Sequence, residues 1–367
     1  MQIDGSYGEG GGQVLRTALT LSAVTGQPLT IVGIRAGRRK PGLQPQHLTS
    51  VRAAAKICSA RVEGDRLDSQ ELSFAPQSPP QPGAYTFDVS QAAKGGSAGA
   101  VSLILQTVLL PLAMAGGPSQ LTLHGGTHVA WSPPYDYLKR VYLPALARMG
   151  ITAKVQIERW GWYPIGGGEV RATIAGVEEI SPSGPLPTSP LPKEGEGEVH
   201  GLDLSQRGEL LRVRGISASS NLPKHIRTRQ EGAALHALRS QGVNARIDLV
   251  DAPSKGQGTA VFLWAECENG AAGFTSLGEL GKPAERVAEE AARDLLVYLD
   301  CGAALDRHLA DQLVLPMALA PGPSQFTAEE VTQHLLTVAW VVNQFFPGRV
   351  RVEGTEGEPG SCHIRPS

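Results

Sequence analysis

Cysteine is scarce in this chain of 367 residues, and its few cysteines show no metal-binding pattern. The four are Cys58, Cys267, Cys301 and Cys362, and no two of them form a CxxC pair. This spacing excludes a disulfide-rich scaffold and gives little support to a zinc site. We therefore expect reduced thiols in a cytoplasmic protein.

Strong charge of either sign and long hydrophobic runs are also missing. The formal net charge is −2, which argues against a long nucleic-acid footprint, because such binding needs a broad basic surface. A single phosphorylated end would need only a local basic cluster. The most apolar run, residues 101–116, is short for a membrane span and contains Gln106 and Pro111, so it predicts a buried helix and no membrane contact. Met1 leads directly into a strand-like segment, so export is not expected.

Glycine and proline are abundant by contrast, with 44 and 27 residues, and they punctuate a repeated unit. Residues 108–123 (VLLPLAMAGGPSQLTL) and 313–328 (LVLPMALAPGPSQFTA) each join an apolar helical segment, a Gly/Pro turn and an extended segment. Residues 10–34 follow the same order with more divergence. Duplicated units of this kind stack on one another to share a core.

One polar residue recurs at the same place in the three units. Counting twelve positions back from the turn proline of each unit reaches Arg16, Gln106 and Asp311. A solvent-facing helix position would explain any one of them alone. Three together favour a shared site, so we predict that the units pack around a pseudo-symmetric cleft and point these side chains into it.

The rest of the chain differs in composition. Residues 178–201 are rich in Pro, Ser and Glu without an apolar period, which predicts a flexible, dispensable surface insertion. Residues 204–302 predict a separate α+β unit with helices near 224–240 and 283–299. We therefore expect an α+β fold of three similar helix–strand units, residues 1–203 and 303–367, with one smaller α+β domain, residues 204–302, inserted between repeats.

A glycine-rich loop precedes an apolar helix that starts near Gln13. Glycines let a backbone approach an anion, and first-turn N–H groups of a helix favour negative charge, so the loop fits a phosphate cradle. It matches neither a dinucleotide-binding motif nor a P-loop, and a plain strand-to-helix turn is the alternative. Glu9 in this loop would repel a polyphosphate unless a divalent cation lay between them, which makes it a candidate Mg²⁺ or Mn²⁺ ligand.

Basic residues gather shortly after this helix. Arg35 and Arg38 can fork onto phosphate oxygens, although a solvated surface explains the same run of charges. Pro45 then begins a helix that presents Gln46 and His47 in its first turn. Either side chain can reach the cleft or belong to the helix surface.

Residues 326–346 predict an apolar helix near the end of the chain, with Thr327 and Glu330 spaced as a capping box at its start. His334 lies at the edge of its core stripe, and a hydrogen-bonded core histidine is the ordinary explanation. A neutral imidazole, with an unperturbed pKa of about 6.5, is nevertheless available as a nucleophile at neutral pH. No Ser or Cys in a recognisable hydrolase motif competes for that role.

Four segments together resemble the RNA 3′-terminal phosphate cyclase family: residues 4–22 (DGSYGEGGGQVLRTALTLS), 34–48 (IRAGRRKPGLQPQHL), 310–320 (ADQLVLPMALA) and the histidine motif QHLLT. The resemblance covers nearly the whole chain except the Pro-rich insertion. It implies a fold of repeated α/β units with one inserted domain. It also implies an ATP-dependent ligase-type nucleotidyl transferase that converts an RNA 3′-phosphate end to a 2′,3′-cyclic phosphate through histidine–AMP and RNA–adenylate intermediates.

The resemblance further implies roles for individual residues. His334 would be adenylylated, and Glu9 would lie at a divalent metal, Mg²⁺ or Mn²⁺. Phosphate contacts would come from Arg16, Arg35, Arg38 and Gln46. Contacts to ATP would come from Gln13, Gln106, His308, Leu309, Ala310, Asp311 and Gln312. The implied partner is an RNA 3′-phosphate end, and the sequence leaves protein partners unknown.

Two positions depart from the family pattern. His308 stands where tyrosine is common, and Ala130 stands where a proline can wall the base, so the selection of ATP over GTP stays open. Two other functions also stay open. One is a non-catalytic relative that binds RNA in ribosome assembly, against which His334 argues. The other is an enolpyruvate transferase, whose repeated architecture is similar.

Overall fold

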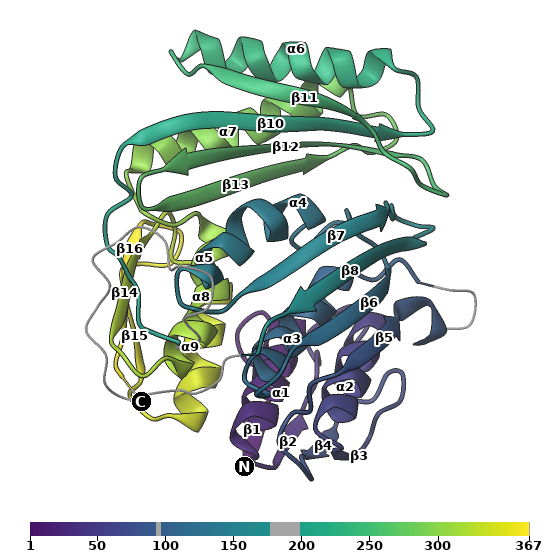
Figure 1. Ribbon diagram of the computed structural model, residues 1–367, viewed down its shortest axis with the longest axis vertical. Coiled ribbons are helices and arrows are strands. Elements are labelled where there is room, and N and C mark those ends of the chain that lie inside the picture. Colours follow the sequence, from purple (N-terminus) through teal and green to yellow (C-terminus); the bar gives the residue numbers. More distant parts are fainter. Residues whose placement is uncertain (93–96, 177–198, 367) are drawn as a thin grey trace.

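The computed structural model describes residues 1–92, 97–176 and 199–366. The predicted Pro/Ser/Glu-rich insertion therefore lies outside the described residues, apart from its last three positions. The described strands form four sheets of four strands each, and helices pack between and around them (Figure 1). Within the described ranges, no helix has the length and apolarity needed to cross a membrane.

The first unit is built on a sheet with the strand order β1-β2-β4-β3. Its elements are β1 (Gln2–Asp4), α1 (Gly12–Thr25), β2 (Leu29–Val32), α2 (Pro45–Ile57), β3 (Arg61–Glu63) and β4 (Leu72–Ala75). β1 is parallel to β2, with Ile3 opposite Ile31, and β4 is antiparallel to β2 and to β3. Burial alternates along β2 and β4, so one face of the sheet enters the core.

Two further units repeat this arrangement. The second contains β5 (Ala84–Asp88), η1 (Val89–Ala92), α3 (Val101–Ala113), β6 (Ser119–Gly125), α4 (Tyr135–Tyr137), η2 (Leu138–Tyr142), α5 (Leu143–Ala147), β7 (Ala153–Arg159) and β8 (Gly168–Ile174). The third contains β9 (Asp203–Leu204), α8 (Arg307–Leu319), β14 (Ser324–Ala328), α9 (Gln333–Phe345), β15 (Val350–Glu353) and β16 (Gly360–Ile364). Each sheet has two parallel strands followed by two antiparallel ones, which confirms the predicted repeat.

A fourth sheet, ordered β11-β10-β12-β13, stands beside the second unit (Figure 1). It contains β10 (Leu210–Ser220), α6 (His225–Ser240), β11 (Ala245–Asp251), β12 (Gly258–Cys267), β13 (Gly270–Leu277) and α7 (Ala284–Cys301). Its own core joins α6 and α7 to one face of the sheet. The chain enters this region after β9 and leaves it before α8, so the fourth sheet interrupts the third unit, where a place between units was expected. The exact domain limits stay a prediction.

The helices of the three units pack against one another in the middle of the molecule. α1 contacts α2, α3 and α9, and α8 contacts α9 (Figure 1). The apolar residues of α1, such as Leu15 and Leu19, are fully buried in this layer. Burial of an apolar stripe from every helix holds the units together, and it brings the polar positions of α1, α3 and α8 close to a common space.

The start of α9 differs from the sequence prediction. Thr327 lies in β14, where its hydroxyl accepts a hydrogen bond from the Ala304 N–H. The N-cap is Thr332, whose hydroxyl accepts from the Leu335 N–H at 3.1 Å. The predicted capping box was wrong because Thr327 belongs to a strand whose residues alternate in burial. His334 therefore lies in the first turn of α9, close to the positive end of the helix dipole.

Candidate active site

The glycine-rich loop between β1 and α1 lies directly on α9. Gly8 has a φ of 63°, and a Cβ atom there would lie 2.4 Å from Oγ1 of Thr337, so a glycine is required. The ring of Tyr7 stacks on Trp340 of the same helix, with centroids 3.9 Å apart. These two contacts hold the next residue, Glu9, beside the first turn of α9.

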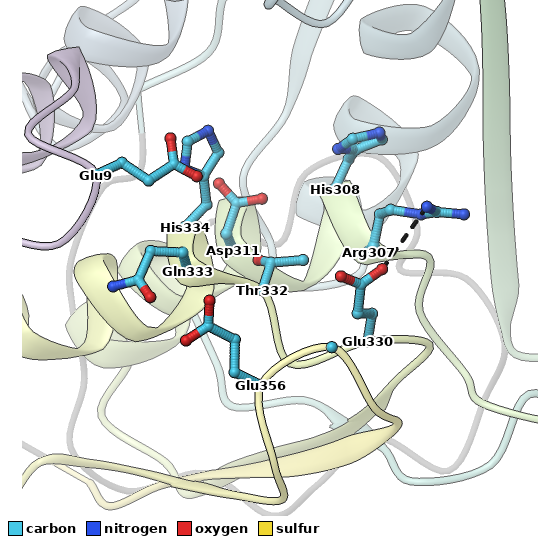
Figure 2. A pocket seen from close by; sticks show the side chains of 10 residues that line it. Glu9, Arg307, His308, Asp311, Glu330, Thr332, Gln333, His334 and Glu356 are labelled. Atoms are coloured by element: carbon cyan, nitrogen blue, oxygen red, sulfur yellow. Dashed lines mark ion pairs between the residues drawn. The ribbon is translucent and has the colours of Figure 1, made fainter. Parts of the chain in front are cut away.

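Glu9 joins an arginine to a histidine. Its Oε2 atom lies 2.9 Å from Nη2 of Arg38, and its Oε1 atom lies 3.5 Å from Nδ1 of His334. Figure 2 shows the carboxylate turned toward the imidazole ring. A carboxylate at this position favours the tautomer with the proton on Nδ1, which leaves the lone pair on Nε2.

The surroundings of His334 keep its ring uncharged. Burial lowers the pKa of His334 below the ordinary value of 6.5, Glu9 opposes this effect, and Arg16 adds to it. The imidazole is consequently neutral at pH 7. Because the residue lies in the first turn of α9, the free N–H groups of the helix favour an anion next to the ring.

A polar network links α1 to α8 behind the histidine. Arg16 Nη2 donates to Oε1 of Gln13 at 2.8 Å, and Gln13 Nε2 donates to Oδ2 of Asp311 at 3.5 Å. Burial lowers the pKa of Arg16 to about 10, and Asp311 opposes that shift. Burial raises the pKa of Asp311 to about 8, so its carboxyl group is largely protonated at neutral pH. The network therefore retains the positive charge of Arg16, which suits an anionic ligand.

The recurring polar residues of the three units come together in space. Arg16, Gln106 and Asp311 all line one cavity of about 1570 Å³. Gln106 Nε2 also donates to Oε1 of Gln312 at 2.7 Å, which ties α3 to α8 at the cavity wall. The cavity extends to the fourth sheet, where Lys255 belongs to its lining.

A smaller cavity of about 510 Å³ lies at the N-terminus of α9 (Figure 2). Its lining comprises Glu9, Arg307, His308, Asp311, Glu330, Thr332, Gln333, His334, Glu356 and Gly357. His308, Asp311 and His334 line both cavities, so the two spaces meet at these three side chains.

Three of the residues expected at phosphates lie outside the linings of these two cavities. Arg35 Nη1 donates to the carbonyl oxygens of Lys40 at 2.6 Å and Gly42 at 3.0 Å, so this guanidinium holds its own loop. Gln46 Oε1 accepts from the Ala100 N–H at 3.2 Å. The third, Arg38, is exposed and touches Glu9, as described above.

The ring of His47 packs against the backbone at Gly12. A Cβ atom on Gly12, the first residue of α1, would lie 2.4 Å from Nε2 of His47, so the helix can begin against this ring only with a glycine there. His47 Nδ1 accepts from the Gln44 N–H at 3.1 Å. Burial, followed by the charges of Arg16 and Arg35, lowers the pKa of His47 to about 3. This histidine is a neutral packing residue.

In residues 308–312, the segment predicted to contact the nucleotide, some side chains are buried in the core and the others line the cavities. Leu309 and Ala310 are fully buried in α8, while His308, Asp311 and Gln312 line the larger cavity. The start of α8 is fixed by Asp306, whose carboxylate accepts from two first-turn N–H groups at 2.9 Å.

The protein offers few ligands for a metal ion. Among the described residues, no group of three or more His, Cys, Asp or Glu side chains could hold one. Glu9 contributes a single carboxylate, which already contacts Arg38. Mg²⁺ is often bound by one or two carboxylates together with substrate phosphates and water. The site therefore fits a cation that arrives with a polyphosphate, and it does not fit a cage built by the protein alone.

Several residues in the walls of the smaller cavity were not predicted from the sequence. Arg307 Nη2 lies 2.8 Å from Oε1 of Glu329, and its Nη1 lies 3.6 Å from Oε2 of Glu330, at the edge of the smaller cavity (Figure 2). Glu356 reaches the same cavity from a turn between β15 and β16. No local pattern marks Glu356, because its place depends on how the third sheet packs.

Comparisons with known proteins agree on one family. The family model described as RNA 3′-terminal phosphate cyclase matches residues 7–352. An RNA 3′-terminal phosphate cyclase of Nostoc punctiforme is 49% identical over 352 residues, covering 96% of each chain. One of Methylococcus capsulatus is 48% identical and covers 100% of this chain and 99% of its own, and one of Methanopyrus kandleri is 42% identical with the same coverage.

A solved structure gives a much weaker likeness. The enolpyruvyl transferase NikO from Streptomyces tendae has a TM-score of 0.28 and 17% identity, and the match covers 54% of this chain and 33% of that one. This likeness is too slight to support any conclusion. The family model and the relatives, which span almost the whole length, show that the chain belongs to the RNA 3′-terminal phosphate cyclase family.

Proposed function

We propose that this protein is an enzyme that converts an RNA 3′-terminal phosphate to a 2′,3′-cyclic phosphate at the expense of ATP. The observation that supports it best is the position of His334, a neutral imidazole oriented by Glu9 where two cavities meet. A nucleophile in such a place can serve a nucleotide and a second substrate in turn. The relatives that carry the cyclase name cover 96% and 100% of the chain.

The first step forms a covalent histidine adduct. Nε2 of His334 attacks the α-phosphorus of ATP, a P–N bond forms, and the bond to pyrophosphate breaks. Glu9 holds the Nδ1 proton and stabilises the positive ring that develops. Arg16 and the N–H groups at the start of α9 neutralise charge on the phosphates, which supplies most of the acceleration in phosphoryl transfer.

The second and third steps use the stored adenylate. An oxygen of the RNA 3′-phosphate attacks the phosphorus of the adduct, the P–N bond breaks, and RNA–adenylate forms. The neighbouring 2′-hydroxyl then attacks the 3′-phosphorus, loses its proton and expels AMP. Activation is needed because a free phosphomonoester has only a poor oxide leaving group. Holding the hydroxyl next to the phosphorus makes the last step intramolecular.

The remaining residues bind ATP, phosphate or a cation, or support the surrounding loops. In this proposal Gln13, Gln106 and the cavity-lining side chains of residues 308–312 bind ATP from the larger cavity. Arg38 contacts phosphate directly, while Arg35 and Gln46 keep the surrounding loops in place. A divalent cation held by Glu9 would supply charge neutralisation to the polyphosphate. ATP and Mg²⁺ or Mn²⁺ are thus the proposed cofactors.

The proposed partner is the end of an RNA strand in the cytoplasm. A net charge of −2 fits recognition of one phosphorylated end and not a long footprint. All four cysteines are free thiols, which suits a reducing compartment.

The proposal is tested by an RNA cyclisation assay with matched histidine variants. His334→Ala and His334→Asn should lose RNA cyclisation by at least about a thousandfold, since they remove the nucleophile. His363→Ala, which removes an exposed histidine on β16 outside both cavities, should keep wild-type activity. RNA binding without cyclisation by the wild type would instead favour the non-catalytic RNA-binding relative.

A further inference from the structure

Two exposed aromatic side chains stand on the larger cavity. Trp131 is 99% exposed and Tyr163 is 78% exposed, and both belong to the cavity lining. Side chains so exposed contribute almost nothing to the hydrophobic core. One exposed aromatic residue would be ordinary, but two on the cavity that contains His334 suggest a role in ligand binding.

The backbone at Trp131 is held in an unfavourable conformation. Its φ is 63°, in the left-handed region that bulky residues rarely adopt. The next residue, Ser132, fixes the turn by donating from Oγ to the carbonyl oxygen of Val129 at 3.0 Å. Strain of this kind persists where the surrounding structure imposes it, and it clusters at ligand sites.

A buried aromatic layer places both residues on the same rim. His128 and Trp162 form an isolated parallel bridge, and the His128 ring stacks on Trp160 with centroids 3.9 Å apart. Trp131 follows His128 by three residues, and Tyr163 follows Trp162 directly. The two exposed rings therefore emerge from one rigid support between the second unit and the fourth sheet.

A positive charge lies beside the turn that follows Tyr163. The stem of Lys255 packs on the turn that follows Tyr163, since a Cβ atom on Gly167 would lie 3.3 Å from its Cδ. Lys255 also lines the cavity, and within the described residues no carboxylate forms an ion pair with it. Lys282 on the same cavity is instead neutralised by Glu290.

The size of the cavity leaves room for a second ligand. At about 1570 Å³ it exceeds the roughly 300–1000 Å³ of a typical single-ligand pocket. We propose that Trp131 and Tyr163 stack nucleobases of the RNA strand upstream of its 3′-phosphate, and that Lys255 contacts a phosphate of that strand. Aromatic platforms with adjacent basic groups bind single strands without regard to sequence. The inference rests on the proposed function and extends it to the RNA.

Anisotropy of a 5′-fluorescein-labelled, ten-nucleotide RNA with a 3′-phosphate tests this platform. Trp131→Asn tolerates the left-handed backbone, so it should fold as well as the wild type. It should raise the Kd for RNA about 5- to 150-fold, as loss of one stacked base does, and adding Tyr163→Ala should raise it further. Lys255→Gln should weaken binding and reduce its dependence on salt. Leu211→Ala, at a 63% exposed residue outside the cavity, should bind RNA normally.

A parallel assay separates the platform from the proposed function. Labelling of the protein by ATP carrying a radioactive α-phosphate, without RNA, should be unchanged in Trp131→Asn and in the double variant. Normal labelling with unaltered RNA affinity in the double variant would overturn the platform. Lost labelling with unaltered RNA affinity would overturn it too, since the rings would then serve the nucleotide. Platform-dependent RNA binding by a wild type that is never labelled would overturn the proposed function alone.

Discussion

Glu9 and His334 come from opposite ends of the chain, yet a carboxylate oxygen of one lies 3.5 Å from Nδ1 of the other. The contact exists because the glycine-rich loop of the first unit packs on the first turn of α9 in the third unit. It favours the tautomer with the proton on Nδ1, which leaves the lone pair on Nε2. The chemistry of the site therefore depends on how two units pack together.

The rate of self-adenylylation should depend on pH through His334. In the proposed mechanism the neutral ring is the nucleophile, so the rate should rise as pH rises through the pKa, and a pKa lowered from 6.5 places the half-maximal rate below pH 6.5. Glu9→Gln removes the charge that raises this pKa, so its half-maximal pH should be lower than in the wild type. Labelling rates from pH 4.5 to 8 give the half-maximal pH of the wild type and of Glu9→Gln. A half-maximal rate above pH 6.5 in the wild type would contradict the lowered pKa of His334.

The same variant should change the need for a cation. If Glu9 is the protein's ligand to the metal, Glu9→Gln should require about tenfold more Mg²⁺ for half-maximal labelling. Glu330→Gln, which changes another acid of the smaller cavity, serves as the control and should keep the wild-type requirement. Equal Mg²⁺ dependence in the wild type, Glu9→Gln and Glu330→Gln would show that Glu9 is not a metal ligand.

Gly8→Ala should be far more damaging than Gly26→Ala. Both glycines have positive φ, so both variants pay a similar backbone strain of about 1 kcal/mol. Only at Gly8 would the new Cβ meet another atom, Oγ1 of Thr337 at 2.4 Å, whereas nothing lies within 4 Å at Gly26. The extra overpacking should cost about 1–3 kcal/mol in chemical denaturation and reduce labelling.

A double variant shows whether that clash is the cause. Thr337→Ala removes the atom nearest to the new Cβ and leaves Nε2 of Gln333 at 3.0 Å, so Gly8→Ala combined with Thr337→Ala should recover part of the lost stability. The backbone strain of an alanine at position 8, where φ is 63°, should remain. Additive losses in the double variant would mean that Gly8 acts only through its backbone.

Asp311 should make the stability of the ligand-free protein depend on pH. Burial raises the folded pKa of Asp311 to about 8, so the carboxyl stabilises the fold fully below its unfolded pKa of about 3.9 and loses this contribution progressively as pH rises from there to about 8. Asp311→Asn cannot ionise, so its free energy of unfolding relative to the wild type should increase between pH 5 and pH 8. The slope should be at most about 1.4 kcal/mol per pH unit. A difference that stays constant over this range would show that Asp311 is ionised throughout.

The two amides at the cavity wall should act as a pair. Gln106→Ala and Gln312→Ala each break the 2.7 Å hydrogen bond between α3 and α8. Each should weaken ATP binding about tenfold, and the double variant should lose less than the product of the two, because the shared contact is lost only once. Unaltered ATP affinity in both single variants would exclude this wall from the nucleotide site.

Much of the architecture could be predicted because the repeat is encoded locally. Apolar helix, Gly/Pro turn and strand recur in each unit, and Arg16, Gln106 and Asp311 occupy the same position in them, so a shared cavity followed from the alignment. The start of α9 could not be read in this way. Thr327 and Thr332 are both acceptable caps in isolation, and the pairing of β14 with β16 decides between them.

The functions of single side chains were harder to read. Arg35 and Gln46 have the chemistry of phosphate ligands, but backbone groups of neighbouring segments bind Nη1 of Arg35 and Oε1 of Gln46. His47 looks like a candidate site residue in sequence and is buried beneath Gly12. Burial and partner choice depend on contacts between units, which no local pattern records.

Peptide mapping of the protein after incubation with ATP and Mg²⁺ tests the central claim most directly. We expect one AMP group on the peptide that contains His334, attached to Nε2 through a bond that is labile in acid and stable in alkali, and absent from His334→Ala. An AMP group on any other residue, or RNA cyclisation by His334→Ala at the wild-type rate, would contradict the claim.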